Sequence, residues 1–422
     1  MKELIYISEN AEIVVGYRYA VAYNFANTRA CEFDKSIGAF LIKSLPRTKE
    51  ILIYIAKKEM LITHQEEQPF KTLLYHLINN SILDTGKEYS FRQSARSTPY
   101  IPFTLVLEIL TQCNFHCRHC YLGDRLNVQH RLEISQISKI LYDAKGIGIQ
   151  QVQITGGNPS LHPDIHELIE LLRYHTFKIF YFSNGMYLDE SLLLALKDAD
   201  AVLHISIYGM SNKSGKWLTG YSNYYDSMMN ALSLIEKYGV KIRSLDYMAV
   251  EENEHEISRF IEFCKEKKYP YRFDSPATIG NAAATRIKNI TEKIVEFEPG
   301  IEPQNASPSF RLCSCEFDQP TILANGDVTF CILSNNNFHE HLLGNIYSHT
   351  LKEIWFNSRT QQLFRETHVN EQNVCRNCEY KYLCGGICPF SKQFHAIQLT
   401  QDGTPDCRRY KDKKFRSWKI TC

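Results

Sequence analysis

The chain has 422 residues, of which 44% are hydrophobic and 23% are charged, and its formal net charge is +1. This length allows two or three domains with a large buried core, and the near-neutral charge excludes an electrostatic case for binding nucleic acid or an acidic membrane. Glu3, Glu9 and Glu12 interrupt the N-terminus and no apolar run approaches a membrane span, so we expect a cytoplasmic protein. In that location, as many as 14 cysteines point to metal binding rather than to disulfides.

Residues 1–83 predict a small α/β unit. Short strand patterns over 4–25 precede helical patterns at 34–45, 48–60 and 69–83. In the last of these, the apolar residues repeat on one helical face: Phe70, Leu73, Leu74, Leu77 and Ile78. This order is typical of a winged helix-turn-helix, which serves either as a packing domain or in DNA binding. No cluster of Lys and Arg marks a recognition helix, so no nucleic-acid partner is expected.

A linker is predicted at 84–100, where the sequence is polar and ends in Ser-Thr-Pro. Residues 101–295 then alternate between two patterns. Strand patterns lie at 103–110, 149–157, 177–185, 201–209, 241–250 and 269–280, and helical patterns lie at 132–146, 165–175, 188–198, 223–238 and 254–267. Six such repeats predict a parallel sheet that forms a partial (β/α)6 barrel. In this architecture the chemistry lies on loops at the C-terminal ends of the strands.

Cys113, Cys117 and Cys120 lie on the first of these loops. Three thiolates on one short loop can hold a four-iron cluster by three corners and leave one iron open. The alternative is a zinc site that takes a fourth ligand, for which His116 and His119 are candidates. Zinc loops favour pairs of cysteines separated by two residues over this x3–x2 triple.

The triple, followed directly by the aromatic Tyr121, resembles the signature of the radical S-adenosylmethionine (radical SAM) enzymes. The resemblance implies that the open iron binds the amino and carboxylate groups of S-adenosylmethionine. One electron from the cluster then yields a 5′-deoxyadenosyl radical, which removes a hydrogen atom from the substrate. The cofactor carries this chemistry, and the protein positions and shields it.

Further matches to that family follow in chain order. Gly156, Gly157, Asn158 and Pro159 resemble the GGEP-type loop that holds the amino group of the cofactor. Asn158 replaces the usual acid. An amide oxygen can still accept a hydrogen bond from an ammonium group, but without the strengthening that a carboxylate adds.

The remaining matches lie at later strand ends. Ser183 and Asn184 resemble a ribose-contacting position, Ser206 resembles another cofactor contact, and Ile279-Gly280 resembles the loop near adenine. Each is weak alone, since such residues after a strand are commonly just turns. Their order behind the cysteine triple makes the set specific.

Residues 296–422 are rich in cysteine and turn residues. The pattern resembles the SPASM extension of radical SAM enzymes, and it uses eight cysteines: Cys313, Cys315, Cys331, Cys375, Cys378, Cys384, Cys388 and Cys407. Eight thiolates suffice for two more four-iron clusters, so the resemblance implies three [4Fe-4S] clusters in all. Asn325-Gly326 predicts a hairpin turn before Cys331. The alternative is one or two structural zinc sites.

The SPASM resemblance implies how these ligands divide. Auxiliary cluster II would use Cys375, Cys378, Cys384 and Cys407, and auxiliary cluster I would use Cys331 and Cys388 with the early cysteines. If both Cys313 and Cys315 bind, cluster I is saturated and relays electrons. If only one binds, an open iron can hold a substrate thiolate. Outside this pattern, Cys264 is predicted to be a buried apolar residue, and Cys31 and Cys422 have no evident partner.

Residues 1–83 resemble the PqqD-like peptide-recognition domains that precede many peptide-modifying SPASM enzymes. The resemblance rests on the order and spacing of the helices. It implies that the leader of a precursor peptide binds as an added strand on a sheet edge. Backbone pairing gives affinity while tolerating sequence changes.

Together these resemblances imply a radical SAM peptide maturase that crosslinks a ribosomally made precursor, most simply through a thioether between a cysteine sulfur and a carbon. An external electron donor such as flavodoxin or ferredoxin is implied. Alternatives are carbon–carbon or carbon–oxygen crosslinking, epimerisation, tetrapyrrole tailoring and a non-catalytic peptide-binding partner. An anaerobic sulfatase maturase is a further alternative, but Ile332 occupies the position of that group's acid. No catalytic acid or base can be named, because the candidates near strand ends are equally compatible with structural roles: His204, Tyr208, Asp246 and Tyr247.

Overall fold

The computed structural model describes residues 4–8, 11–24, 29–59, 61–63, 65–85, 102–274, 276, 280–285, 287–288, 319–332, 342–357, 359–360, 369–384 and 398–407. The chain divides into two compact units. The barrel unit contains Tyr100–Ile301 and Asp318–Gln361, and the terminal unit contains Met1–Pro99, Glu302–Phe317 and Gln362–Cys422. Four of the cysteines and one predicted cofactor contact lie outside the described residues: Cys313, Cys315, Cys388, Cys422 and Ile279.

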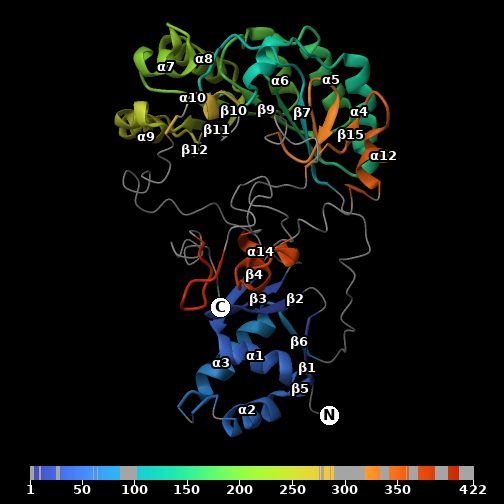
Figure 1. Cartoon of the computed structure of the whole chain (residues 1–422), viewed down its shortest axis with the longest axis vertical. Helices are drawn as coiled ribbons and strands as arrows, with labels where there is room; N and C mark the ends of the chain where they lie inside the picture. The colour runs from blue at the N-terminus through green and yellow to red at the C-terminus, as the bar shows by residue number, and fades with distance from the viewer. Residues whose placement is uncertain are drawn as a thin grey trace. The chain divides into compact units, whose positions relative to one another are not determined.

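A parallel sheet forms the centre of the barrel unit. Six strands lie side by side in chain order: β7 (Thr104–Glu108), β8 (Gln151–Thr155), β9 (Lys178–Ser183), β10 (Val202–Ile207), β11 (Lys241–Met248) and β12 (Tyr271–Asp274). Every neighbouring pair is parallel, so each connection must cross over the sheet. This arrangement confirms the predicted β–α series and its partial barrel (Figure 1).

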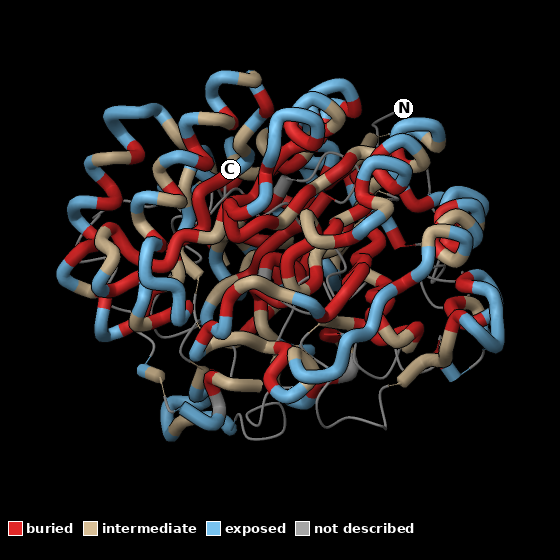
Figure 2. The backbone as a smooth tube through the Cα atoms, turned by 90° about the horizontal axis from the view of Figure 1, so that it is seen from above, coloured by how far each residue is buried: buried red, intermediate tan, exposed pale blue. Residues whose placement is uncertain are grey.

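Helices pack on one face of this sheet. Five match predicted helices: α4 (Ile134–Ile147), α5 (Ile165–Tyr174), α6 (Glu190–Asp198), α8 (Tyr224–Tyr238) and α9 (Ile257–Lys267). A further helix, α7 (Asn212–Thr219), was not predicted. Leu203, Ile205 and Ile207 of β10 join the apolar core with the helices, so His204 and Ser206 face the opposite side of the sheet. Figure 2 shows buried strands and helices that alternate between buried and exposed turns.

Residues from beyond the predicted boundary at 296 extend the same sheet. β13 (Thr321–Ile322) pairs in parallel with β7, and β14 (Asp327–Thr329) and β15 (Gly344–Asn345) continue it in antiparallel fashion. Gly326, with φ +86°, forms the predicted hairpin turn. α12 (Leu351–Phe356) begins with a Thr350–Glu353 capping box and packs on α4. The described residues 319–332, 342–357 and 359–360 of the C-terminal cysteine-rich region therefore fold with the barrel.

The N-terminal part of the terminal unit contains two small sheets and three helices. β2 (Ala11–Val15), β3 (Tyr19–Asn24) and β4 (Arg29–Asp34) form one antiparallel sheet, and β1 (Leu4–Ile7) pairs with β5 (Arg47–Thr48) and β6 (Leu83–Thr85) in the other. The helices are α1 (Lys35–Ser44), α2 (Lys49–Lys58) and α3 (Glu67–Asn79). The three predicted helices are confirmed, but four strands precede them rather than two or three. No helix of the described ranges is long and apolar enough to cross a membrane.

One face of the β2–β3–β4 sheet packs against residues 369–384. The two share an apolar cluster: Val14, Val21, Tyr23, Ala30, Val369, Tyr380, Tyr382 and Leu383. Beside this cluster, the carboxylate of Glu379 accepts hydrogen bonds from the backbone N–H groups of residues 17–19 at 2.9, 3.1 and 3.2 Å. A Cβ atom on Gly16 would lie 2.1 Å from this carboxylate, so only glycine allows the approach. The N-terminal sheet and the late cysteine region therefore form one packed body.

Candidate radical SAM site

The loop that follows β7 carries the first three cysteines, and neighbouring elements hold it through backbone groups. The N–H groups of His116 and Arg118 donate to carbonyl oxygens of Thr219 and Leu218 at the end of α7, both at 2.9 Å. On another side, Asn281 of α10 (Gly280–Thr285) donates from Nδ2 to the Cys117 carbonyl and from its backbone N–H to the Cys120 carbonyl, both at 2.9 Å. The protein itself therefore sets the conformation of the cysteine loop.

Gly280 explains how α10 can lie so close to the cysteine loop. Its φ is +59°, and a Cβ atom there would lie 2.4 Å from the Cys120 carbonyl oxygen and 2.7 Å from that of Tyr121. Both the dihedral angle and the space require glycine. The sequence predicted that Gly280 lies near adenine, and the structure places it against the backbone of the cysteine loop.

The three thiols are buried to different degrees, and none of them forms a disulfide. Burial raises the pKa of Cys113, and burial with the charges of the other two thiols raises that of Cys117 well above its usual value. Burial raises the pKa of Cys120 to about 11. A reactive cysteine would instead have a lowered pKa. Thiols of this kind become thiolates when a metal binds them, so the sulfur ligands suit an iron–sulfur cluster.

The geometry does not favour a mononuclear zinc site. In the part of the chain that the structure describes, no three His, Cys, Asp or Glu side chains are grouped as ligands of one metal ion. Buried His119, a candidate fourth zinc ligand, has no hydrogen-bond partner at Nδ1, and burial lowers its pKa to about 4. Its ring lies 5.1 Å from that of Tyr208. In a four-iron cluster each thiolate binds a different iron, so the ligands need not converge on one ion.

The Gly-Gly-Asn loop after β8 packs against the segment that leads to Cys113. The N–H of Gly157 donates to the Leu110 carbonyl at 2.8 Å, and that of Asn158 donates to the Gln112 carbonyl at 2.9 Å. A Cβ atom on Gly157 would lie 2.0 Å from the Gln112 carbonyl oxygen, so this contact requires glycine. Pro159 follows at the start of a short 3-10 turn. The loop is therefore held beside the cysteines.

Asn114, which lies between the first two cysteines, joins two of the predicted cofactor loops. Its Oδ1 accepts hydrogen bonds from Nδ2 of Asn158 at 2.9 Å and Nδ2 of Asn184 at 3.1 Å. The Nδ2 of Asn184 also lies 3.8 Å from Sγ of Cys113. Asn158 is fully buried, and its Oδ1 accepts the backbone N–H of Ser160 at 3.3 Å. Sequence reasoning missed Asn114, although its place inside the cysteine motif was an available signal.

Ser183 and Ser206 end neighbouring strands close to this site. Oγ of Ser183 accepts the N–H of Gly185 at 3.0 Å, which shapes the turn after β9. Burial and the charge of Cys117 raise the pKa of Tyr208 well above its usual value. A side-chain hydrogen bond with Ser206 acts in the opposite direction but is outweighed. The ring of Tyr208 packs against those of Phe115 and His119 in the cysteine loop, so its bond to Ser206 connects β10 to that loop.

Tyr121 connects the cysteine loop to the sheet. Its hydroxyl donates to Oε2 of Glu108 at 3.2 Å and lies 3.4 Å from the Gly156 carbonyl oxygen. Glu108 is fully buried, forms an ion pair with Arg125 and accepts the N–H of Ala324 at 3.3 Å. The aromatic residue after the last cysteine therefore has a structural function, which is to tie the two cofactor loops to β7.

The later cysteines are divided between the two units. Cys331 follows β14 in the barrel unit. In the terminal unit, Cys375 begins a 3-10 turn (Cys375–Asn377) and Cys378 follows it, with the N–H of Cys378 donating to the Cys375 carbonyl at 2.9 Å. Cys384 ends α14 (Lys381–Cys384), and Cys407 follows a turn in the same unit. The relation of Cys313 and Cys315 to cluster I lies outside the described residues.

Two of the remaining cysteines are placed by the structure. Cys264 is fully buried in the core on α9, as predicted. Cys31, for which the sequence indicates no partner, is buried on β4 and engaged in a disulfide. Neither residue belongs to the predicted cluster ligands.

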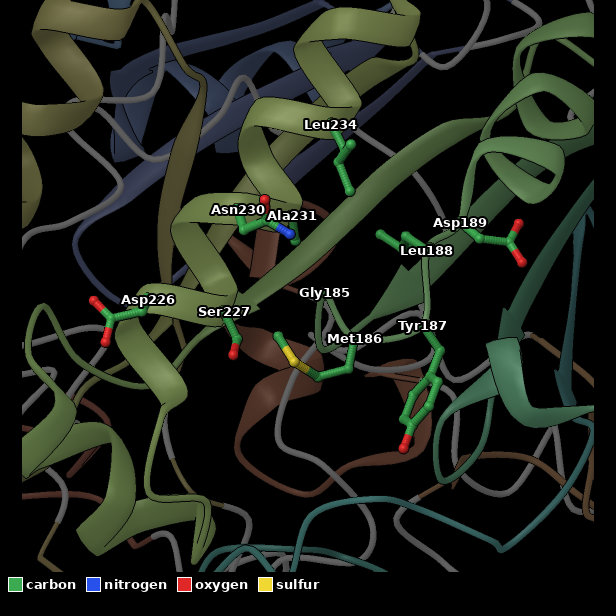
Figure 3. Close-up of a pocket in the computed structure, with 10 residues that line it drawn as sticks. All are labelled: Gly185, Met186, Tyr187, Leu188, Asp189, Asp226, Ser227, Asn230, Ala231 and Leu234. Carbon is green, nitrogen blue, oxygen red and sulfur yellow. The ribbon is translucent and has the colours of Figure 1, made fainter.

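A pocket of ≈ 430 Å³ lies between the turn after β9 and helix α8. Figure 3 shows its lining residues: Gly185, Met186, Tyr187, Leu188, Asp189, Asp226, Ser227, Asn230, Ala231 and Leu234. Tyr187 has φ +61°, which places this exposed residue in the left-handed region. The pocket contains none of the predicted cluster ligands and touches the predicted ribose-contacting segment 183–185 only at Gly185, so the cysteine loop rather than this pocket marks the site.

Two family models match the regions that carry the cysteines. The model of the radical SAM superfamily matches residues 107–264, and that of SPASM, an iron–sulfur cluster-binding domain, matches residues 313–379. Among curated proteins, a probable GTP 3′,8-cyclase of Sulfolobus acidocaldarius is 30% identical over 153 residues, which are 36% of this chain and 48% of the cyclase. The chain thus spans about half the length of that relative.

Other similarities extend further along the chain. The antilisterial bacteriocin subtilosin biosynthesis protein AlbA of Bacillus subtilis is 21% identical over 339 residues, which are 74% of each chain. The structure of Streptococcus suis SuiB bound to precursor peptide SuiA superimposes with a TM-score of 0.57 at 19% identity, covering 91% of this chain and 95% of SuiB. That of anSMEcpe with bound AdoMet gives a TM-score of 0.51 at 15% identity, covering 75% of this chain and 92% of anSMEcpe.

The structural similarities show a shared fold, and the family matches cover the cysteine loop and the C-terminal cysteines up to Cys378. The chain therefore carries a radical SAM domain over residues 107–264 and a SPASM iron–sulfur cluster-binding domain over residues 313–379.

Proposed function

We propose that this enzyme matures a ribosomally made precursor peptide by forming an intramolecular crosslink, with a cysteine sulfur-to-carbon thioether as the first candidate. The observation that carries the proposal is the presence of three parts in one chain: the radical SAM loop, the C-terminal cysteines and the small N-terminal fold. When bound, the cluster and S-adenosylmethionine supply a radical that removes a hydrogen atom from the peptide.

In this proposal Cys113, Cys117 and Cys120 of the cysteine loop hold the iron–sulfur cluster that binds S-adenosylmethionine. The residues around the cofactor are those predicted from the sequence: Gly156, Gly157, Asn158, Pro159, Ser183, Asn184, Ser206, Ile279 and Gly280. Asn114 supports them because its single oxygen orients the amides of Asn158 and Asn184. An external donor such as flavodoxin or ferredoxin supplies the electron for cofactor cleavage.

Two auxiliary clusters give the proposed crosslink its electron sink. Forming a thioether from a C–H and an S–H group removes two hydrogens from the peptide, so an electron must leave after the hydrogen atom is taken. We assign auxiliary cluster II to Cys375, Cys378, Cys384 and Cys407. Cluster I takes Cys331 and Cys388 with one or both of the early cysteines, Cys313 and Cys315. This gives three [4Fe-4S] clusters per chain.

The β2–β3–β4 sheet offers an edge to the leader of the precursor. Its two faces are covered in the described structure, one by an apolar core that includes α1 and α3 and the other by residues 369–384. Among the described strands, β4 pairs only with β3, so its other edge can take an added strand. A pocket of ≈ 380 Å³ lies at the end of β4, and in this proposal it accepts an apolar side chain of the leader. The pocket is lined by Asp34, Ser36, Ile37, Leu61, Ile62, Glu66, Pro69, Phe70 and Leu73.

Binding measurements test this leader site. We expect Leu73→Ala to weaken binding of a fluorescently labelled leader peptide, because Leu73 lines the pocket. Tyr75→Ala is the matched control, since Tyr75 lies on the same helix with 59% of its surface exposed and outside the pocket. Equal leader affinity of the two variants would contradict this site.

The similarities agree with a peptide substrate. AlbA is named for bacteriocin biosynthesis, and SuiB was solved with a precursor peptide. A sulfatase-maturase function is less well supported. Ile332 stands at the position of that group's acid, and anSMEcpe covers 75% of this chain where SuiB covers 91%.

Anaerobic co-expression tests the proposed function. The enzyme is expressed with each short reading frame that flanks its gene, and each peptide is analysed by mass spectrometry before and after thiol alkylation. A thioether predicts the loss of two hydrogens per crosslink and one cysteine that no longer reacts. Two hydrogens lost with every cysteine still reactive would indicate a carbon–carbon or carbon–oxygen link. Unchanged mass with inverted residues would indicate epimerisation, and no modified peptide would contradict the proposal.

A further inference from the structure

His204 lies on β10, on the sheet face opposite the helices. It is two residues further than Ser206 from the C-terminal end of the strand, which is the end near the cysteine loop. Its ring stacks on Phe182 of β9 with centroids 4.4 Å apart and planes 7° apart, and 10% of its side chain is exposed. Tyr208, just beyond the end of β10, packs against Phe115 and His119 of the cysteine loop. At about 3.3 Å per residue, the Cα atoms of His204 and Tyr208 are roughly 13 Å apart along the chain. His204 therefore lies on the sheet face opposite the helices, four residues before the tyrosine that contacts the cysteine loop.

The hydrogen bonds around His204 determine which ring nitrogen carries its proton. The hydroxyl of Ser244 donates to Oδ1 of Asp246, so Oγ of Ser244 acts as an acceptor toward Nδ1 of His204 at 3.0 Å. Oδ2 of Asp246, 3.2 Å from the same nitrogen, is also an acceptor. Since both neighbours of Nδ1 accept, Nδ1 carries the proton of the neutral ring, and Nε2 keeps a lone pair.

The groups behind this ring are buried and paired. Ser244 and Asp246 are buried with His204, and Nη2 of Arg272 lies 2.9 Å from Oδ2 of Asp246 and 3.5 Å from Oδ2 of Asp274. A carboxylate hydrogen-bonded to Nδ1 fixes the tautomer and orientation of an imidazole whose Nε2 accepts a proton. Within the described ranges, Nε2 itself has no hydrogen bond, so it is available to a substrate.

We propose that Nε2 of His204 accepts the proton that the peptide loses during crosslinking, with Asp246 and Ser244 as positioning residues. This inference rests on the proposed function. In the thioether case one C–H and one S–H bond break and one S–C bond forms. The hydrogen atom of the C–H bond goes to the radical derived from S-adenosylmethionine, one electron goes to an auxiliary iron–sulfur cluster, and the S–H proton goes to Nε2.

The first test needs no peptide. The anaerobic holoenzyme is treated with diethyl pyrocarbonate, which acylates imidazole nitrogens that have a lone pair, and the modified histidines are mapped by mass spectrometry. We expect His204 to react, and to react at least tenfold more slowly in Asp246→Asn, because a side-chain amide can donate to Nδ1 and move the proton to Nε2. His162 is the internal control: its Nδ1 accepts the Asp164 N–H at 3.1 Å and its Nε2 bonds the Leu132 carbonyl at 2.9 Å. An unreactive His204, or equal rates in the two proteins, would overturn the inference.

The second test uses the peptide that co-expression identifies. His204→Gln should lower the rate of crosslinking about 10²-fold or more, the usual contribution of a proton acceptor, and leave cleavage of S-adenosylmethionine without peptide within about twofold. His166→Gln, on the exposed face of α5, is the matched control.

A His204→Gln enzyme that crosslinks at the wild-type rate would overturn the inference, even with the proposed function intact. Parallel losses of crosslinking and uncoupled cleavage would also overturn it, because they would indicate a structural role. If wild type modifies no peptide, the proposed function fails, and the acylation result alone decides whether His204 is an available proton acceptor.

Discussion

Alanine at Gly280 should disturb the cysteine loop more than alanine at Gly220. Both glycines have left-handed φ angles, +59° and +77°, so both variants incur about 1–2 kcal/mol for placing a side chain in that region. They differ in space. The new Cβ at Gly220 would meet nothing nearer than His116 Cβ at 3.8 Å, whereas at Gly280 it would lie 2.4 Å from the Cys120 carbonyl oxygen.

Relieving that overlap requires the cysteine loop or α10 to move by several tenths of an ångström. Overpacking of this kind adds about 1–3 kcal/mol, so Gly280→Ala should be less stable than Gly220→Ala by that amount. At about 2–4 °C per kcal/mol, the difference in Tm is about 2–12 °C. Because the strain falls on the backbone of a cluster ligand, Gly280→Ala should also hold less iron and cleave less S-adenosylmethionine.

Thermal unfolding of the anaerobically purified variants, followed by circular dichroism, measures the difference in stability. Iron content and 5′-deoxyadenosine formation report the state of the cluster. Equal Tm values with equal iron and equal cleavage would refute the reasoning, because α10 would then not be packed on the cysteine loop.

Three further predictions concern other parts of the molecule. Replacing Cys113, Cys117 and Cys120 together by Ala should remove about four of about twelve irons per chain and abolish cofactor cleavage. Zinc in place of iron in the anaerobically purified wild-type protein would refute the cluster assignment. Asn114→Ala removes one hydrogen-bond acceptor from each of two buried amides, although Nδ2 of Asn158 keeps the Met186 carbonyl at 3.2 Å. It should cost about 1–3 kcal/mol and weaken S-adenosylmethionine binding, whereas Asn114→Asp keeps the acceptor; equal affinity in both variants would count against Asn114 as the joining residue. Glu379→Ala removes the acceptor for three backbone N–H groups and should lower the unfolding free energy of the terminal unit by about 1.5–3 kcal/mol. Hydrogen exchange at residues 17–19 should be faster in this variant than in Glu379→Gln, which keeps an acceptor oxygen. Unchanged exchange in both variants would contradict the packing of the N-terminal sheet on the late cysteines.

Much of the barrel unit follows from local periodicity. The apolar alternation of each strand and the 3.6-residue repeat of each helix are present in the sequence itself, so the β–α order over 103–274 could be predicted. Helix α7 could not, because residues 212–219 carry a weak apolar pattern. Its ends depend on Ser211, which caps it, and on Gly220, which ends it in the left-handed region.

The contacts that sequence reasoning missed are long-range. Glu379 contacts the backbone of residues 17–19 across about 360 positions, and no local pattern encodes such a partner. The packing also means that deleting residues 1–83 would expose the apolar cluster beside Cys375 and Cys378, so point variants test leader binding more cleanly. Within the site, the cysteine spacing indicated the ligands, but the hydrogen bonds that fix Asn114 and His204 depend on how neighbouring strands align.

Isotope transfer shows whether the hydrogen atom removed by the 5′-deoxyadenosyl radical comes from the peptide. The co-expressed precursor is prepared with deuterium at the carbon that becomes crosslinked and is incubated with the reconstituted enzyme, S-adenosylmethionine and a reductant in ordinary water. We expect 5′-deoxyadenosine that carries one deuterium, formed in the same amount as the crosslinked peptide. Crosslinked peptide accompanied by 5′-deoxyadenosine without deuterium would contradict this expectation.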